Sequence, residues 1–159
     1  MSSKVCKMPG SNIADKIAQC KSDSRAALVT FMTCGFPDKN STVKALLAME
    51  KSGSDIIEVG VPFSDPTAEG GTIQVSSKKA LDNKTTMIDC FNAVEQARKA
   101  GLTVPVILMG YYNNWLAHGL EKVCQDSKRV GVDGFIIVDL PPEEGGKFLG
   151  FCKKYELSY

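Results

Sequence analysis

Residues 55–71 read DIIEVGVPFSDPTAEGG, a short apolar run followed by a loop rich in Pro, Gly, Ser and acidic residues. Such a run, bounded by turn residues, is typical of a strand buried on both faces of a parallel sheet. Glu58 interrupts it near the carboxyl end, where burying an unpaired charge is unfavourable. In parallel sheets with helical crossovers, ligands bind at the carboxyl ends of strands and in the loops that follow. Two roles therefore remain open for Glu58: a structural carboxylate that caps backbone amides or pairs with a lysine, and a functional acid.

The composition is that of an ordinary soluble globular protein, with 43% hydrophobic and 23% charged residues. We expect a single domain over residues 1–159, with residues 1–11 flexible, because no linker or low-complexity segment divides the chain. A net charge of +1 indicates neither nucleic-acid nor membrane binding, and no apolar run is long enough to span a bilayer. The first residues lack the apolar core of a secretion signal, so we expect a cytoplasmic protein, with a plastid location left open.

The cysteines and the single histidine do not have the spacing of a metal site or of a Ser-His triad. Without a secretion signal, we expect the six cysteines to be reduced thiols. We expect His118 to lie in a loop or at a helix start, and we expect no metal. The cysteines are Cys6, Cys20, Cys34, Cys90, Cys124 and Cys152.

The apolar periodicity predicts a lead helix and then a strand followed by helical sequence, four times over. Such a pattern forms a parallel sheet with right-handed crossovers, either as an open doubly wound sheet or as a closed eight-stranded barrel. No G-x-G-x-x-G turn follows the first strand, so a dinucleotide fold lacks its usual signature. A closed barrel normally needs about 250 residues, so this chain supplies roughly half of one. The predicted strands are 26–32, 55–60, 104–109 and 134–138; the later helices are 41–53, 72–81, 86–100, 120–129 and 142–155.

Carboxylates gather where the predicted strands end. Glu58 and Asp139 lie at strand ends, and the loop after residue 60 adds Asp65 and Glu69. Burial disfavours the charged form of Glu58, which suits a group that donates and accepts protons near neutral pH. Two carboxyls in different environments would form an acid/base pair, although Asp139 could instead cap the loop before two prolines.

Four apolar residues near the same ends could form walls for a flat aromatic ligand, or could be ordinary barrel packing. They are Phe31, Ile73, Met109 and Ile136.

The segment IIEVGVPFSDPTAEGGTIQ, residues 56–74, resembles the signature of the tryptophan synthase α-subunit family. Three further motifs resemble that family in the same order: TFMTCGFPD at 30–38, VPVILMGYYNN at 104–114 and GVDGFIIVDLPPEE at 131–144. Together the resemblance covers nearly all of residues 12–159.

The resemblance implies a TIM (β/α)8 barrel, here as about four β/α units plus a lead helix. It also implies retro-aldol cleavage of indole-3-glycerol phosphate to indole and glyceraldehyde 3-phosphate. Glu58 matches the family's catalytic glutamate, which handles the protons, and Glu69 stands where the family has a catalytic aspartate that receives the indole N–H. Five positions match those that surround the indole: Phe31, Ile73, Met109, Tyr111 and Ile136.

The resemblance further implies no cofactor in this chain. Indole would pass to a β-subunit or fused β-domain that carries pyridoxal phosphate. Pro62, Asp65 and Asn113 match loop positions that face this partner.

The sequence departs from the family pattern in two respects. Glu69 is one methylene longer than Asp, and misplacing a carboxylate by about an ångström can lower a rate roughly a hundredfold. Gly71 stands where Pro is usual, so a softer loop could either accommodate Glu69 or only add disorder.

The second departure is the end at Tyr159, where strand five is expected to begin. The family's catalytic tyrosine and phosphate-binding amides belong to the second half of the barrel, and the outer strands would have unpaired edges. We therefore expect the isolated half to lack useful activity. Two alternatives are a free-standing indole-glycerol-phosphate lyase and a non-catalytic half-barrel that binds or regulates a β-subunit.

Overall fold

The computed structural model describes residues 11–159, and the stretch predicted to be flexible lies outside them apart from Ser11. Four strands form one parallel sheet in the order β1-β2-β3-β4, as the sequence predicts. The strands are β1 (Val29–Thr33), β2 (Ile56–Gly60), β3 (Val106–Gly110) and β4 (Gly134–Ile137). The helices are α1 (Ser11–Ser22), α2 (Lys39–Lys51), α3 (Gly71–Asp82), α4 (Met87–Lys99), α5 (Tyr112–His118), α6 (Leu120–Val130) and α7 (Gly145–Lys154).

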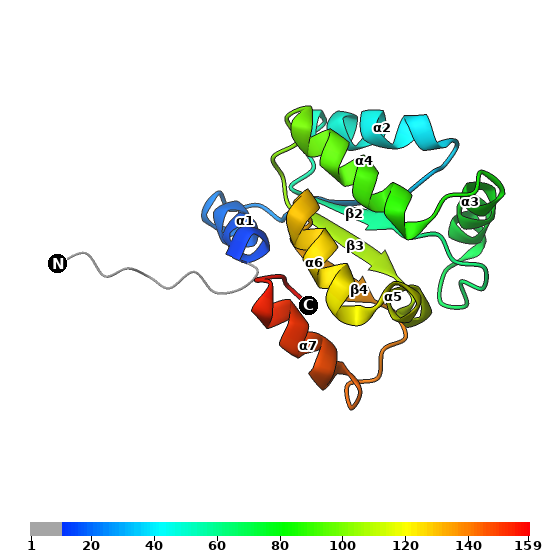
Figure 1. Ribbon diagram of the computed structural model, residues 1–159. Coiled ribbons are helices and arrows are strands. Elements are labelled where there is room, and N and C mark those ends of the chain that lie inside the picture. Colours follow the sequence, from blue (N-terminus) through cyan, green and yellow to red (C-terminus); the bar gives the residue numbers. More distant parts are fainter. Residues whose placement is uncertain (1–10) are drawn as a thin grey trace.

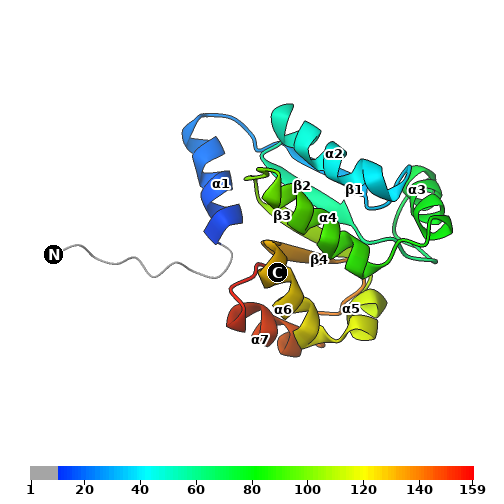
Figure 2. The same ribbon diagram turned by 45° about the horizontal axis from the view of Figure 1, so that its top comes forward.

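Helices α2, α4, α6 and α7 lie in sequence along one face of the sheet, whereas α3 and α5 lie near the carboxyl ends of the strands (Figures 1 and 2). Alternate strand residues fill the core between the sheet and these outer helices. Ile57 and Val59 of β2 are fully buried there, as is Leu108 of β3. Because side chains alternate across a strand, Glu58 and Met109 must point to the opposite face. On that face Phe31, Glu58 and Met109 are half-buried and Ile136 is exposed, whereas Ile56 is buried.

The first strand begins three residues later than predicted because Asp55 organises the segment before it. The Asp55 carboxylate accepts hydrogen bonds from the Arg25 guanidinium (2.6 and 2.8 Å) and from the Leu28 amide (2.9 Å). This ion pair ties the segment before β1 to the residue before β2. Residues 26–28 therefore act as an anchor outside the sheet, and regular pairing between β1 and β2 starts at Val29.

This anchor predicts a dependence of stability on pH. The Arg25 side chain lowers the pKa of Asp55 well below its usual value, so the pair contributes stability above the unfolded-state pKa of about 3.9. That contribution is lost as pH falls towards the folded-state pKa. We expect the gap in unfolding free energy between the wild type and Asp55→Asn, measured in urea, to stay constant from pH 6 to about pH 5 and to narrow from there to pH 3. A gap that does not change over this range would contradict the role of the pair.

Three helices differ from the prediction. Helix α2 begins at Lys39, two residues before the predicted start, because Asp38 is its N-cap and its carboxylate accepts from the Ser41 amide (3.0 Å). Helix α5 was not predicted, and it places His118 at a helix end rather than in a loop or at a helix start. Its first amide, Tyr112 N–H, donates to Asp139 Oδ1 (2.6 Å), a cap supplied from 27 residues away. Helix α7 starts at Gly145 rather than near Pro142, because residues 142–144 form a turn.

The sheet's outer edges belong to β1 and β4, as predicted. Next to β4, Ser158 forms a parallel bridge with Gly134, and its carbonyl accepts from the Phe135 amide (3.0 Å). Ser158 therefore covers the amino-terminal end of the β4 edge.

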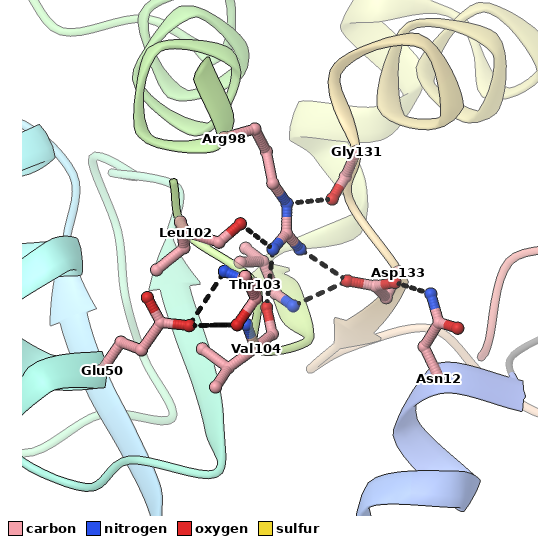
Figure 3. A network of polar contacts seen from close by, with 9 residues as sticks. Asn12, Glu50, Arg98, Leu102, Thr103, Val104, Gly131 and Asp133 are labelled. Atoms are coloured by element: carbon pink, nitrogen blue, oxygen red, sulfur yellow. Dashed lines mark hydrogen bonds and ion pairs between the residues drawn. The ribbon is translucent and has the colours of Figure 1, made fainter. Parts of the chain in front are cut away.

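At the amino-terminal ends of β3 and β4, Arg98 is the centre of a polar network (Figure 3). Its guanidinium donates to Asp133 Oδ2 (2.9 Å) and to the carbonyls of Gly131, Leu102 and Val104. Asp133 also accepts from the Val106 amide (2.8 Å). The network fixes the strands at the end of the sheet opposite to the predicted site.

Candidate active site

Glu58 lies in the middle of β2, with Phe31 and Ile107 as its neighbours across the sheet. The side chain is half-buried, and within residues 11–159 it has no hydrogen bond or ion pair. Neither of the structural roles left open by the sequence, capping amides or pairing with a lysine, is present there. Burial raises the pKa of the Glu58 carboxyl, which brings it closer to neutral pH. The arrangement suits a group that gives and takes protons.

The loop at 61–70 folds over the carboxyl ends of β1, β2 and β3 and brings Glu69 to the predicted site. Glu69 lines a small cavity of about 10 Å³, room for one water molecule at most. Four of the predicted indole-facing residues line the same cavity: Phe31, Ile73, Met109 and Tyr111. Glu58 and Ile136 are not among its lining residues. Ile136 lies beside Met109 in the sheet and is 38% exposed.

Glycine at position 60 leaves room for Phe31. A Cβ atom on Gly60 would lie 2.6 Å from Phe31 Cζ, which is closer than two nonbonded carbon atoms approach each other in proteins. The Phe31 ring therefore covers the backbone at the end of β2 and forms one wall of the cavity.

We expect Gly60→Ala to lower the unfolding free energy by about 1–3 kcal/mol, because the ring must leave its position. The same substitution in a Phe31→Ala background should lower it by less, since the clash is gone. Equal losses in the two backgrounds, measured by urea denaturation, would show that Phe31 does not set the requirement for glycine.

Tyr111 lies at the end of β3 with only 3% of its surface exposed. Its hydroxyl accepts a hydrogen bond from the Ala68 amide (2.8 Å) and donates one to Glu69 Oε2. Its ring stacks on Phe63, with ring centroids 4.8 Å apart. Desolvation and the neighbouring Glu69 carboxylate raise the pKa of Tyr111. Tyr111 thus contacts the loop that carries Glu69, a connection that the sequence did not reveal.

A family model described as tryptophan synthase alpha chain matches residues 17–159. The chain belongs to the tryptophan synthase alpha chain family. It is 47% identical over 147 residues to the alpha chain of Geobacter sulfurreducens, covering 92% of this chain and 55% of that protein. It is also 50% identical over 141 residues to the tryptophan synthase of Saccharomyces cerevisiae, covering 89% of this chain and 20% of that protein.

Solved structures agree with this assignment. The alpha subunit from Legionella pneumophila superposes with a TM-score of 0.89 at 38% identity, covering 92% of this chain and 56% of that one. A tryptophan synthase structure from M. tuberculosis gives a TM-score of 0.87 at 34% identity, covering 91% and 58%. The predicted fold class is confirmed: a lead helix and four β/α units of the TIM (β/α)8 barrel family. The chain spans about half the length of the curated alpha chains that it matches.

The partner-facing positions expected in this family differ in exposure. Asp65 and Asn113 are exposed, whereas Pro62 is buried and its carbonyl accepts from Asn114 Nδ2 (3.4 Å). Pro62 also lines a groove of about 320 Å³ with residues of α4 and α5. The role of these positions in a complex stays a prediction.

Several hydroxyl groups near the site had no sequence signal. Ser77 of α3 accepts from the Phe63 amide (2.9 Å) and donates to the Phe63 carbonyl (3.0 Å). Ser76 lies within 2.7 Å of the Thr33 hydroxyl at the end of β1. These contacts span 14 and 43 residues, so no local motif announces them.

Residues 11–159 contain no cluster of three or more His, Cys, Asp or Glu side chains arranged to hold a metal ion. His118 pairs with Asp126 (2.9 Å), and the described cysteines are free and buried. Over the same residues, no helix is both long and apolar enough to cross a bilayer.

Proposed function

We propose that this chain provides the proton-transferring half of a tryptophan synthase α-type lyase, which cleaves indole-3-glycerol phosphate to indole and glyceraldehyde 3-phosphate. The observation that carries the proposal is Glu58, a half-buried and unpaired carboxyl with a raised pKa at the family's catalytic position. In the retro-aldol step, indole C3 gains a proton, the glycerol hydroxyl next to the breaking bond loses one, and the carbon–carbon bond electrons pass to the ring. Glu58 serves as the group that carries these protons.

Glu69 accepts the indole N–H and stabilises positive charge on the protonated ring. Phe31, Ile73, Met109 and Ile136 hold the ring between apolar walls. The present cavity beside Glu69 holds at most one water molecule and does not include Glu58, so its walls must rearrange before indole can lie between the two carboxyls.

The reaction on this chain needs no cofactor, since proton transfer and an orienting carboxylate suffice. Indole then passes to a β-subunit or β-domain that carries pyridoxal phosphate, with Pro62, Asp65 and Asn113 facing that partner. The yeast relative named tryptophan synthase, of which this chain covers only 20%, supports a fused arrangement in some relatives. The comparisons do not favour the free-standing lyase or the regulatory module.

The test uses a chimera in which residues 17–159 of this chain replace the matching part of the Geobacter sulfurreducens alpha chain. This chimera supplies the remaining part of the barrel, so it isolates the chemistry of the residues described here. We expect it to release indole from indole-3-glycerol phosphate well above the background rate. A folded chimera that binds the substrate but releases no indole would contradict the proposal.

A further inference from the structure

We propose that Tyr111 is a positioning residue that holds the Glu69 carboxylate in place, and that Ser77 anchors the loop on which Tyr111 acts. This inference rests on the proposed function, because it names the residue that positions the Glu69 carboxylate. The family resemblance places Tyr111 only in the wall around the indole.

The Tyr111 hydroxyl uses its donor and one acceptor position within the protein. It accepts from the Ala68 amide (2.8 Å) and donates to Glu69 Oε2, so it fixes two consecutive loop residues. Tyr111 itself is buried at the end of a strand, which gives it one defined position. Within residues 11–159, Glu69 Oε1 accepts no hydrogen bond and is available to an indole N–H.

Ser77 of α3 holds the amino-terminal part of the loop at Phe63. Ser77 binds both the amide and the carbonyl of Phe63, much as a neighbouring strand would. The Phe63 ring then stacks on Tyr111 at an interplanar angle of 22°. Helix α3, Phe63 and Tyr111 therefore form one continuous support from the helix to the Glu69 carboxylate.

The two residues after Glu69 are glycines at the start of α3, so they offer no side chain to hold the longer acid. Gly70 and Gly71 follow directly, and an added Cβ atom on either would meet nothing within 4 Å. The Glu69 backbone is held by its own amide, which donates to the Pro66 carbonyl (3.3 Å), and by the Gln74 side chain, whose amide donates to the Glu69 carbonyl (2.9 Å). Within residues 11–159, the Glu69 carboxylate is held by Tyr111 alone. In this proposal, the loop accommodates the longer Glu69 side chain because Tyr111 holds its carboxylate.

The direct test is NMR on the 159-residue chain, with 15N backbone labels and 13Cζ-tyrosine. Tyr111→Phe removes the acceptor of the Ala68 amide, so we expect Ala68 hydrogen exchange to accelerate at least tenfold. Tyr112→Phe, at the adjacent half-buried tyrosine, is the matched control and should leave Ala68 unchanged. Glu69→Gln should lower the pKa of Tyr111, because the carboxylate that disfavours its ionisation is gone.

The anchor is tested with a second pair of variants. Ser77→Ala should accelerate exchange of the Phe63 amide, whereas Ser76→Ala, on the same helix, should not. Unchanged exchange at Phe63 in Ser77→Ala, or at Ala68 in folded Tyr111→Phe, would overturn the corresponding part of the proposal.

In the chimera, a positioning role predicts that Tyr111→Phe lowers kcat about 10-fold to 100-fold and changes KM little. Glu69→Asp should also lower kcat, because the shorter acid loses the Tyr111 contact. If Tyr111→Phe raises KM without lowering kcat, Tyr111 only lines the indole site and does not position Glu69. If Glu69→Asp has a higher kcat than the parent chimera, Tyr111 does not hold the Glu69 carboxylate in a productive position. If no form of the chimera releases indole, the proposed function fails, while the NMR result still decides the positioning.

Discussion

Glu58→Gln in the chimera is expected to reduce indole release by about 10²–10⁴-fold, the range that general acid–base groups contribute. Glutamine keeps the size and shape of the side chain but cannot exchange a proton at C3 or with the glycerol hydroxyl. Single-turnover release of indole, followed by absorbance, measures the loss. Glu95→Gln on the outer helix α4 is the matched control and should retain full activity. A Glu58→Gln variant with more than about a third of the parent rate would rule out the proposed role.

The same substitution separates catalysis from structure through its effect on stability. Burial raises the folded-state pKa of Glu58, so the charged carboxylate disfavours folding at pH values above that pKa. Glu58→Gln should therefore leave the unfolding free energy at pH 7 unchanged or increase it. A structural acid, in contrast, would lose stability together with activity.

The largest expected effect on stability is that of Arg98→Met in the network of Figure 3. The substitution leaves the Asp133 carboxylate, whose side chain is 10% exposed, without its cation, and it removes donors from three carbonyls. Removing one partner of a buried ion pair costs about 3–5 kcal/mol. Urea denaturation of the 159-residue chain measures the change in unfolding free energy.

Arg129→Met is the matched control, because Arg129 is 58% exposed and its ion pairs lie on the surface. It should cost less than about 1 kcal/mol. Similar losses for Arg98→Met and Arg129→Met would show that the network does not hold the amino-terminal end of the sheet.

The strands could be predicted because short apolar runs bounded by turn residues mark them. Which side chains face the outer helices was not predicted: Val59 and Leu108 are buried against the helices, and Glu58 and Met109 lie half-buried on the opposite face. The order of the strands follows from the repeated strand–helix units and the preference for right-handed crossovers.

The parts that escaped prediction depend on contacts between distant residues. The first amide of α5 is capped by Asp139, 27 residues away, and a seven-residue helix carries little periodicity of its own. The link between Tyr111 and Glu69 spans 42 residues, so the resemblance indicated only that Tyr111 lines the cavity. Side-chain contacts of this kind form only once the sheet has brought its strand ends together.

The most direct test of the account is exchange of the C3 hydrogen of indole for deuterium at neutral pD, followed by proton NMR. It needs only Glu58, Glu69 and the apolar walls, all of which lie in the 159-residue chain. The account predicts that the chain accelerates exchange at C3 above the buffer rate and that Glu58→Gln removes the acceleration. Exchange at the buffer rate with folded, indole-saturated chain, or equal acceleration by Glu58→Gln, would contradict the claim that Glu58 transfers protons to the ring.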